Sequence, residues 1–131
     1  MIWERQLQEN VLQLGEFITH VDVPWPKPNT QGVYLKARER SAEDFASASV
    51  AVVLTAEHGI VDRVRIVLGG VAAKPRRVTD VESMIVGRRI RDLDFDALTL
   101  QAVHGAKPLT QNEHKVSLIK TLVCRALEFL S

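Results

Sequence analysis

Residues 50–68 read VAVVLTAEHGIVDRVRIVL, and this stretch decides the fold. Its two halves, 50–57 and 60–68, are rich in β-branched residues, which favour strands. His58 and Gly59 stand between the halves, where glycine adopts a positive φ without strain and histidine tolerates it moderately. The stretch therefore predicts a β-hairpin.

Two stretches before the hairpin alternate in a strand-like way. Residues 16–23 place two sets of side chains on opposite faces, and residues 32–38 do so again. Between them, residues 24–28 read PWPKP, and three prolines hold the chain extended as a surface connector. A strand is therefore predicted on each side of the connector. The faces of the first strand would carry Phe17, Thr19, Val21 and Val23 on one side, and Ile18, His20 and Asp22 on the other.

Two short helical pieces are expected in the same half of the chain. Residues 1–14 carry three leucines and one valine at a spacing that suits a helix leading to Gly15. Residues 41–44 read SAED, which resembles a capping sequence, with Asp in place of the usual Glu or Gln. A brief helical turn is predicted there.

The second half of the chain carries helix signals. Residues 79–82 read TDVE, a capping box, and Gly87 supplies a left-handed stop about two turns later. Asp92 or Asp94 is expected to cap another helix, which Gly105 ends. Two short helices are therefore predicted in this region.

The last helix is expected to be the longest. Residues 110–113 read TQNE, a second capping box, and apolar residues then recur every three or four positions. These are Val116, Ile119, Val123, Ala126 and Leu130. Strands come first and helices last, so the expected fold is an α+β domain, a small antiparallel β-sheet with helices packed on one face.

Length and composition fit one globular domain spanning residues 1–131, with residues 1–9 as a leader of uncertain structure. The net charge of +1 argues against a nucleic-acid partner. The apolar runs are far shorter than the roughly 20 residues that cross a membrane, and the start lacks a secretory signal. A cytoplasmic location is therefore expected. Cys124, alone in an apolar helical stretch, is interpreted as a small core side chain.

Residues that usually carry chemistry do not converge in the sequence. The four histidines are too scattered to suggest a metal site, and the serines lack a Gly-x-Ser-x-Gly pattern. Gly69-Gly70 lacks the rest of a nucleotide-binding loop and is interpreted as a close backbone contact at a sheet edge. Two basic clusters remain, each able to hold an anion. They are Lys36, Arg38 and Arg40, and Lys74, Arg76 and Arg77 with Arg88, Arg89 and Arg91.

Several short stretches match one known family in order and spacing. They are Gly15 to Thr19, Val23-Pro24, Lys36 to Arg40 with Asp44-Phe45-Ala46, Leu68 to Ala72, Pro75-Arg76-Arg77, and Glu82 with Gly87. Together they resemble the C-terminal domain of the flavoprotein subunit of molybdenum hydroxylases, the family of xanthine dehydrogenase and carbon monoxide dehydrogenase. The resemblance covers about residues 10–130.

The resemblance implies a position beside a flavin. In the family, this domain packs beside a larger FAD-binding domain, and the segment that matches residues 36–44 lies by the flavin ring. Lys36, Arg40, Glu43 and Asp44 thereby become candidate residues at the flavin edge. Nearby cations favour a reduced, anionic flavin and nearby carboxylates disfavour it. A charged strand end followed by a helix cap explains the same residues equally well.

FAD is expected only in a complex, because the family's phosphate-binding glycine loops belong to the other domain. The first hypothesis is therefore a noncatalytic domain of a molybdenum-hydroxylase flavin subunit, which assembles with the FAD-binding domain and with molybdenum and iron–sulfur subunits. The alternative is a free-standing interaction module that kept the fold, lost flavin binding and self-associates. An autonomous small enzyme ranks last, since no nucleophile, base or metal ligands converge. The sequence departs from the family pattern at residues 107–112 and at His114-Lys115, which bears on contacts between the last helix and partner subunits.

Overall fold

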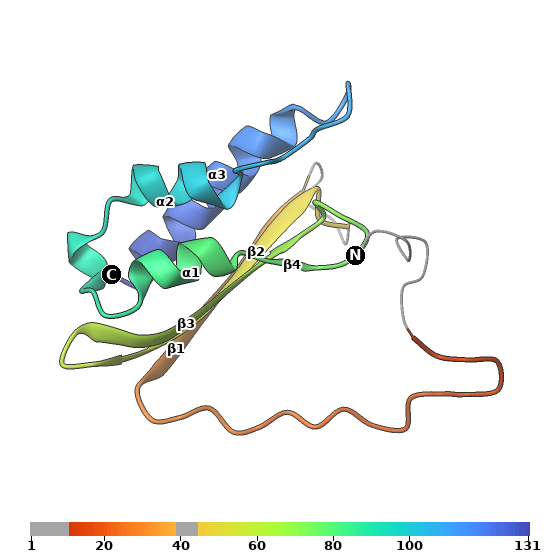
Figure 1. Ribbon diagram of the computed structural model, residues 1–131, viewed down its shortest axis with the longest axis horizontal. Coiled ribbons are helices and arrows are strands. Elements are labelled where there is room, and N and C mark those ends of the chain that lie inside the picture. The colour runs from red at the N-terminus through yellow and green to blue at the C-terminus, as the bar shows by residue number, and fades with distance from the viewer. Residues whose placement is uncertain (1–10, 39–44) are drawn as a thin grey trace.

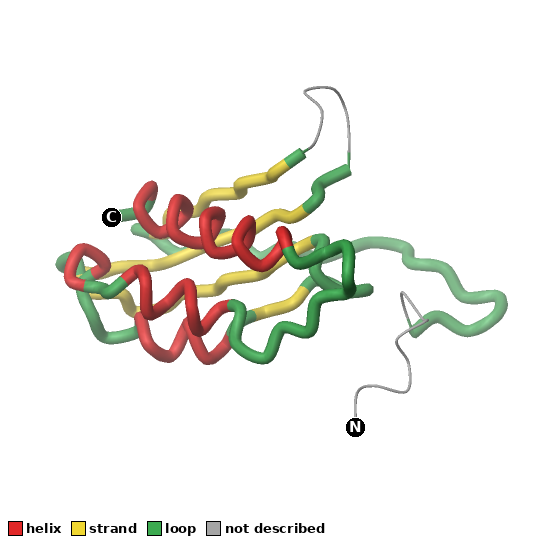
Figure 2. The backbone as a smooth tube through the Cα atoms, turned by 90° about the horizontal axis from the view of Figure 1, so that it is seen from above, coloured by secondary structure: helices red, strands yellow, loops and turns green. Residues whose placement is uncertain are grey.

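The computed structural model describes residues 11–38 and 45–131. Within them, four antiparallel strands form one sheet in the order β1-β2-β3-β4. The strands are β1 (Thr30–Ala37), β2 (Ala48–Glu57), β3 (Ile60–Gly69) and β4 (Arg76–Arg77). The helices are α1 (Thr79–Ile85), the 3₁₀ helix η2 (Ile90–Asp92), α2 (Phe95–Ala102) and α3 (His114–Phe129). The helices lie on one side of the sheet (Figure 1, Figure 2), which confirms the expected α+β architecture.

The central hairpin forms as predicted. β2 and β3 pair in antiparallel register from Ser49 opposite Gly69 down to the turn. His58 and Gly59 make that turn with φ angles of 52° and 79°, the left-handed pair that favoured two-residue hairpin turns require. β1 pairs with the other side of β2, so the strand predicted over residues 32–38 is also confirmed.

The core lies between the sheet and the helices. Alternate side chains of each strand turn toward the helices, because successive residues of a strand face opposite sides. α3 packs across β1 and β2, α1 lies beside β3, and α2 contacts both helices. The fully buried side chains include Val50, Val52, Val61, Val64, Ile66, Val81, Ile85, Leu98, Val123 and Leu127.

The end of β3 approaches the start of β2 so closely that only glycine fits. Gly70 has a φ of +72°, and a Cβ there would lie 2.9 Å from the carbonyl oxygen of Ser47 and 3.2 Å from that of Ala46. A Cβ on Gly69 would collide with the side-chain oxygen of Ser49. Gly69-Gly70 is therefore a close backbone contact, as predicted.

The strand predicted over residues 16–23 is wrong for this structure. These residues are exposed and pair with no strand among the described residues. Figure 1 shows this part of the chain lying apart from the sheet, so no strand of the sheet is beside it. The helix predicted over residues 1–14 is absent from its described part, residues 11–14, and the rest lies outside the described residues. The turn predicted at 41–44 lies outside them as well.

The predicted helix stops and one predicted cap are confirmed. Asp94 caps α2, and its carboxylate accepts a hydrogen bond from the N–H of Ala97 at 3.1 Å. Gly87 and Gly105 have φ angles of 80° and 72° and lie directly behind the turns where α1 and α2 end. These glycines provide the left-handed conformation that ends a helix.

Neither predicted capping box forms. α1 has Val78 at its N-cap, and an apolar side chain cannot accept a capping hydrogen bond. The Glu82 carboxylate, which a capping box would also use, is taken by partners outside the helix. α3 begins only at His114, so Thr110 lies in the loop before it and is too far along the chain to cap it. The positions of both helices were thus predictable, whereas the way they begin was not.

Candidate functional site

The outer face of the sheet, which points away from the helices, carries an exposed aromatic ring beside a cation. Val33 and Leu35 of β1 pack against the core, so the alternating residues Tyr34 and Lys36 point outward. Tyr34 is 61% exposed, and Lys36 is exposed as well. We call these two residues, with the β2 residues opposite them, the β1 surface.

The floor of the β1 surface is made of short side chains. Ala51 lies opposite Tyr34, and Ser49 lies opposite Lys36. The next residue in that row is Gly69 on β3, which faces Ser49. Ser49 is itself only 7% exposed, so the parts of this surface that are open to solvent are chiefly the side chains of Tyr34 and Lys36.

One of the four flavin-edge candidates lies on this surface. Lys36 belongs to it, whereas Arg40, Glu43 and Asp44 lie outside the described residues. Tyr34 is the member that sequence reasoning did not single out. Its signal was present in the alternation that places it on the face of Lys36 and opposite the apolar residues.

The second basic cluster does not form a single anion site. Arg77 instead binds Glu82, with Nη2 2.6 Å from Oε2. Arg65 lies 3.4 Å from the same oxygen, and the N–H of Ile66 donates to Oε1 at 2.9 Å. Glu82 is only 4% exposed, so its carboxylate ties α1 to the edge of β3 and to β4. The other members of the cluster are exposed.

The electrostatics of Glu82 fit a structural role. Burial alone would raise its pKa, but the hydrogen bonds from Arg77 and Ile66 and the charges of Arg77 and Arg65 outweigh burial and hold the pKa below its ordinary value. The hydrogen bond to Glu82 in turn raises the pKa of Arg77. A carboxylate that is held ionised and occupied by donors is a poor proton acceptor, so this cluster is not a candidate for acid–base chemistry.

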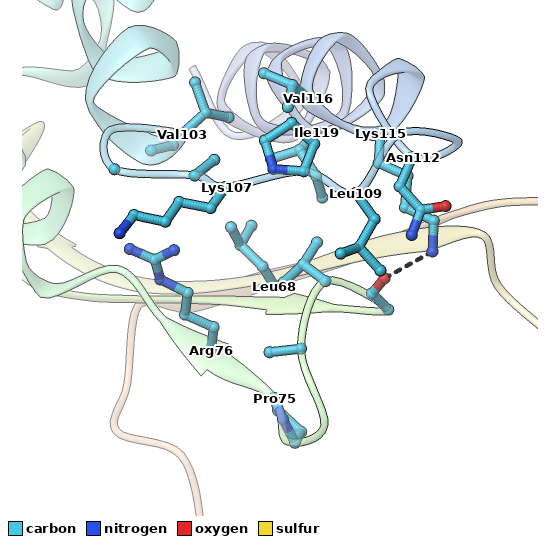
Figure 3. A pocket seen from close by; sticks show the side chains of 17 residues that line it. Leu68, Pro75, Arg76, Val103, Lys107, Leu109, Asn112, Lys115, Val116 and Ile119 are labelled. Carbon is cyan, nitrogen blue, oxygen red and sulfur yellow. Dashed lines mark hydrogen bonds between the residues drawn. The ribbon is translucent and has the colours of Figure 1, made fainter. Parts of the chain in front are cut away.

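A groove of about 970 Å³ opens on the helix side of the sheet, between the β3–β4 connection and the loop before α3 (Figure 3). Leu68 and Ile119 contribute to its apolar lining. Arg76, Lys107 and Lys115 add positive charge, and the described residues that line it include no carboxylate. Lys115 donates from Nζ to the carbonyl oxygen of Gly70 at 3.0 Å, which ties α3 to the β3–β4 connection. The groove thus offers charge and apolar surface without a group suited to catalysis.

Cys124 is half-buried on α3 rather than part of the core, so its predicted core position is wrong. Its Sγ lies 3.5 Å from Oε1 of Glu128. Burial, with the hydrogen bond to this carboxylate and its charge, raises the pKa of the Cys124 thiol. The thiol is therefore kept protonated at neutral pH and is a poor nucleophile.

Neither a metal-binding cluster nor a membrane-spanning helix is found among the described residues. Across residues 11–38 and 45–131, no three His, Cys, Asp or Glu side chains gather as a metal site would require. No helix in the same ranges has the length and apolar character to cross a membrane.

Comparison with a solved structure supports the observed fold. A chain of the carbon monoxide dehydrogenase from Hydrogenophaga pseudoflava superimposes with a TM-score of 0.73 and 26% sequence identity. The superposition covers 81% of this chain and 38% of that chain. The similar part is therefore one portion of a longer protein.

Two curated relatives are also longer than this chain. It is 32% identical over 123 residues to the nicotine 6-hydroxylase medium subunit of Paenarthrobacter nicotinovorans, which covers 88% of this chain and 41% of that protein. It is 33% identical over 78 residues to the glyceraldehyde dehydrogenase medium chain of Sulfolobus acidocaldarius, 60% of this chain and 27% of that protein. The chain thus spans less than half the length of either relative.

The family itself is shown by a match over most of the chain. Residues 33–130 match the family described as the CO dehydrogenase flavoprotein C-terminal domain. The match to the nicotine 6-hydroxylase medium subunit is longer than this range and also extends upstream of residue 33. On its matched residues and its fold, the chain belongs to the CO dehydrogenase flavoprotein C-terminal domain family, as the resemblance of its sequence predicted.

Proposed function

We propose that this domain serves a molybdenum-hydroxylase-type oxidoreductase by lining one side of the FAD pocket with its β1 surface and by holding the flavin subunit in the complex. The exposed pair of Tyr34 and Lys36 on an uncovered sheet face carries the proposal. The domain contributes no catalytic residue in this role. It shapes the surroundings of a cofactor that a neighbouring domain binds.

The chemistry of the β1 surface suits the ring end of a flavin. An exposed tyrosine ring offers a flat apolar face to another aromatic ring system. Lys36, two residues along the same face, supplies a positive charge that favours the negative charge of a reduced flavin. Ala51, the residue opposite Tyr34, has a short side chain, which leaves room for the flavin ring beside the tyrosine.

The phosphate end of FAD needs a different kind of site. Glycine-rich loops bind diphosphates because several successive backbone N–H groups converge on the ligand. In the described residues, the glycines with positive φ stand singly in turns, at positions 15, 59, 70, 87 and 105. We therefore expect the FAD-binding domain to supply the phosphate site, and the purified chain alone to be colourless.

The partners follow from the same role. FAD supplies the redox chemistry when bound in the neighbouring domain, and iron–sulfur and molybdenum subunits would complete the electron path. The curated relatives are a medium subunit and a medium chain, which agrees with a place among several subunits. This chain's own part is to position one wall of the flavin pocket and to keep water from that side of the ring.

The test changes one charge on the β1 surface in the assembled complex. Lys36→Met keeps the length of the side chain and removes its cation, so the flavin should become harder to reduce and its potential more negative. Lys107→Met is the matched control, because Lys107 is an exposed cation on the helix side of the sheet. Both potentials are measured by reductive titration of the flavin absorbance. Equal potentials in Lys36→Met and the unmodified complex would remove Lys36 from the pocket.

The same titration applies to the candidates outside the described residues. Arg40→Ala should shift the flavin potential in the same direction as Lys36→Met, because it also removes a nearby cation. Glu43→Gln and Asp44→Asn should shift it in the opposite direction, because they remove nearby negative charge. A shift in none of these variants would contradict the proposal for the whole segment 36–44.

A further inference from the structure

Residues 16–23 carry four large, exposed apolar side chains and pair with no strand among the described residues. Phe17 and Val21 are each 77% exposed, and Val23 is 83% exposed. We call residues 16–23 the N-terminal segment. Several large apolar side chains that are exposed close together usually mark a surface that another element covers.

The backbone of the N-terminal segment also lacks partners. Its hydrogen bonds stay local, from the N–H of Glu16 to the carbonyl of Gln13 and between the side chains of Thr19 and His20. Among the described residues, the backbone N–H and C=O groups of residues 17–23 bind nothing. A row of unpaired groups on an extended chain is the donor and acceptor pattern of a β-strand that awaits a sheet edge.

The side chains agree with that interpretation because they distinguish two faces. Phe17, Val21 and Val23 fall on one face of an extended chain, with Thr19 between them. Ile18, His20 and Asp22 fall on the other, where His20 Nε2 lies 3.6 Å from an Asp22 carboxylate oxygen. A mainly apolar face backed by a mainly polar one is the pattern of a strand at the surface of another domain's sheet.

We infer that the N-terminal segment is a strand of the FAD-binding domain's sheet, contributed by this chain to the edge of that sheet. Similarity to a medium subunit extends upstream of the family domain and into this segment, which indicates that the segment belongs with the medium subunit beyond the α+β domain. The inference rests on the proposed function, because that function supplies the neighbouring domain. It holds whether one polypeptide or two carry the domains.

This strand would anchor the β1 surface. Only residues 24–29, with prolines at 24, 26 and 28, separate the N-terminal segment from β1. Prolines stiffen such a connector by fixing φ. A strand fixed in the neighbouring sheet would therefore hold the start of β1, and with it Tyr34 and Lys36, at a set distance from the flavin.

The first experiment identifies the neighbour. Phe17 is replaced by the photo-cross-linker p-benzoylphenylalanine in the full chain, the complex is assembled in cells, and the linked peptides are mapped by mass spectrometry. The expected link joins Phe17 to an edge strand of the FAD-binding domain. Links only to β1 of a second copy would overturn the inference in favour of exchanged strands between copies. Links to a molybdenum or iron–sulfur subunit alone would overturn it as well.

The second experiment measures strand pairing. Amide hydrogen exchange of residues 17–23 should be fast in the free chain and at least about 100-fold slower in the complex, as for hydrogen-bonded strands. Val21→Asp, on the apolar face, should abolish this protection. His20→Asp adds the same charge one residue away on the opposite face and should leave the protection intact. Equal exchange in free and assembled chain would contradict the inference.

These readouts separate the inference from the proposed function. Protected residues 17–23 with an unaltered flavin potential in Lys36→Met would keep the strand and reject the pocket wall. An altered flavin potential in Lys36→Met with fast exchange of residues 17–23 would support the pocket wall and reject the strand.

Discussion

Arg77 meets Glu82 side-on, with its Nε 2.9 Å from Oε1 and its Nη2 2.6 Å from Oε2 of the carboxylate. This two-point geometry is stronger and more directional than a single ion contact. It joins the last residue of β4 to the middle of α1. The carboxylate also accepts a hydrogen bond from the N–H of Ile66. β4 pairs with the two residues that follow Ile66 in β3 and leaves this N–H without a partner in the sheet. One buried side chain thus closes the sheet edge and fixes a helix to it.

Glu82→Gln should destabilise the domain at neutral pH. Glutamine keeps an acceptor for the Ile66 N–H but loses the charge that pairs with Arg77 and Arg65, at a cost of about 2 kcal/mol. Chemical denaturation followed by circular dichroism measures the difference in unfolding free energy. Asp80→Asn, an exposed carboxylate in the same helix, is the matched control and should change little. Equal stabilities of Glu82→Gln and the unmodified chain would refute the structural role.

The same variant should change the response to acid. The pKa of Glu82 is lower in the folded chain than in the unfolded chain, so its stabilisation is complete above the unfolded-state value of about 4.3. It is lost as the pH falls through the lower folded-state pKa. The stability gap between the two proteins should therefore shrink from pH 7 to about pH 2. A constant gap across this range would show that ionisation of Glu82 does not matter.

Ile119→Asp should unfold α3 from the sheet. Ile119 is 2% exposed, so the substitution places an unpaired charge in the core and should cost about 4 kcal/mol. Thermal melting measures the loss. Ser117→Asp adds the same charge to an exposed position of α3 and should melt close to the unmodified chain. Similar melting of both variants would mean that the buried face of α3 lies elsewhere.

Gly70→Ala should cost more than Gly87→Ala. Both glycines have a positive φ, so both substitutions carry a conformational penalty of about 1 kcal/mol. A Cβ on Gly87 meets nothing within 4 Å, whereas one on Gly70 collides with the backbone at Ser47. Urea denaturation of the two variants isolates the collision, because the backbone penalty is common to both. A larger loss for Gly87→Ala would contradict the close contact.

Cys124 should alkylate slowly at neutral pH. Its raised pKa leaves little thiolate, the reactive form, and the thiolate fraction should grow as the solution becomes more alkaline. Glu128→Gln removes a nearby negative charge, lowers the pKa and should speed the reaction with iodoacetamide. Glu113→Gln, which changes an exposed glutamate at the other end of α3, should leave the rate unchanged. A fast reaction that does not depend on pH would refute the raised pKa.

The elements that sequence predicted well are those whose signal is local. The hairpin depends on β-branched strands and on His58-Gly59, which adopt the required turn by themselves. The Asp94 cap is equally local, because the carboxylate and the N–H of Ala97 are three residues apart. Alternation in residues 32–38 likewise predicted a strand with two faces, and Lys36 lies on the exposed one. Each of these features is decided within one short stretch of chain.

The features that sequence predicted wrongly depend on distant partners. The TDVE pattern promised a capping box, but Arg77, Arg65 and Ile66 compete for the Glu82 carboxylate, and they hold it more strongly than a helix end would. Residues 16–23 had the alternation of a strand. Alternation separates the side chains onto two faces, but it does not provide the adjacent strand with which the backbone must pair. For the same reason, the sequence predicted only one of the two described residues of the candidate site. Charge made Lys36 a candidate from the sequence, whereas Tyr34 is a candidate because of its exposure on the outer face, which is a property of the folded chain.

The two edges of the sheet are unequal, and this limits how the domain can assemble. Beyond β4, the edge of β3 is closed: Ile66 is held by Glu82 and Val78, and Val61 by the backbone of Gly87 and Arg88. In the described part of the chain, β1 pairs on one side only. β4, the strand at the opposite edge, has only two residues and leaves little backbone for a further strand to pair with. The eight residues of β1 are therefore the longer edge, and a second sheet would join the domain there.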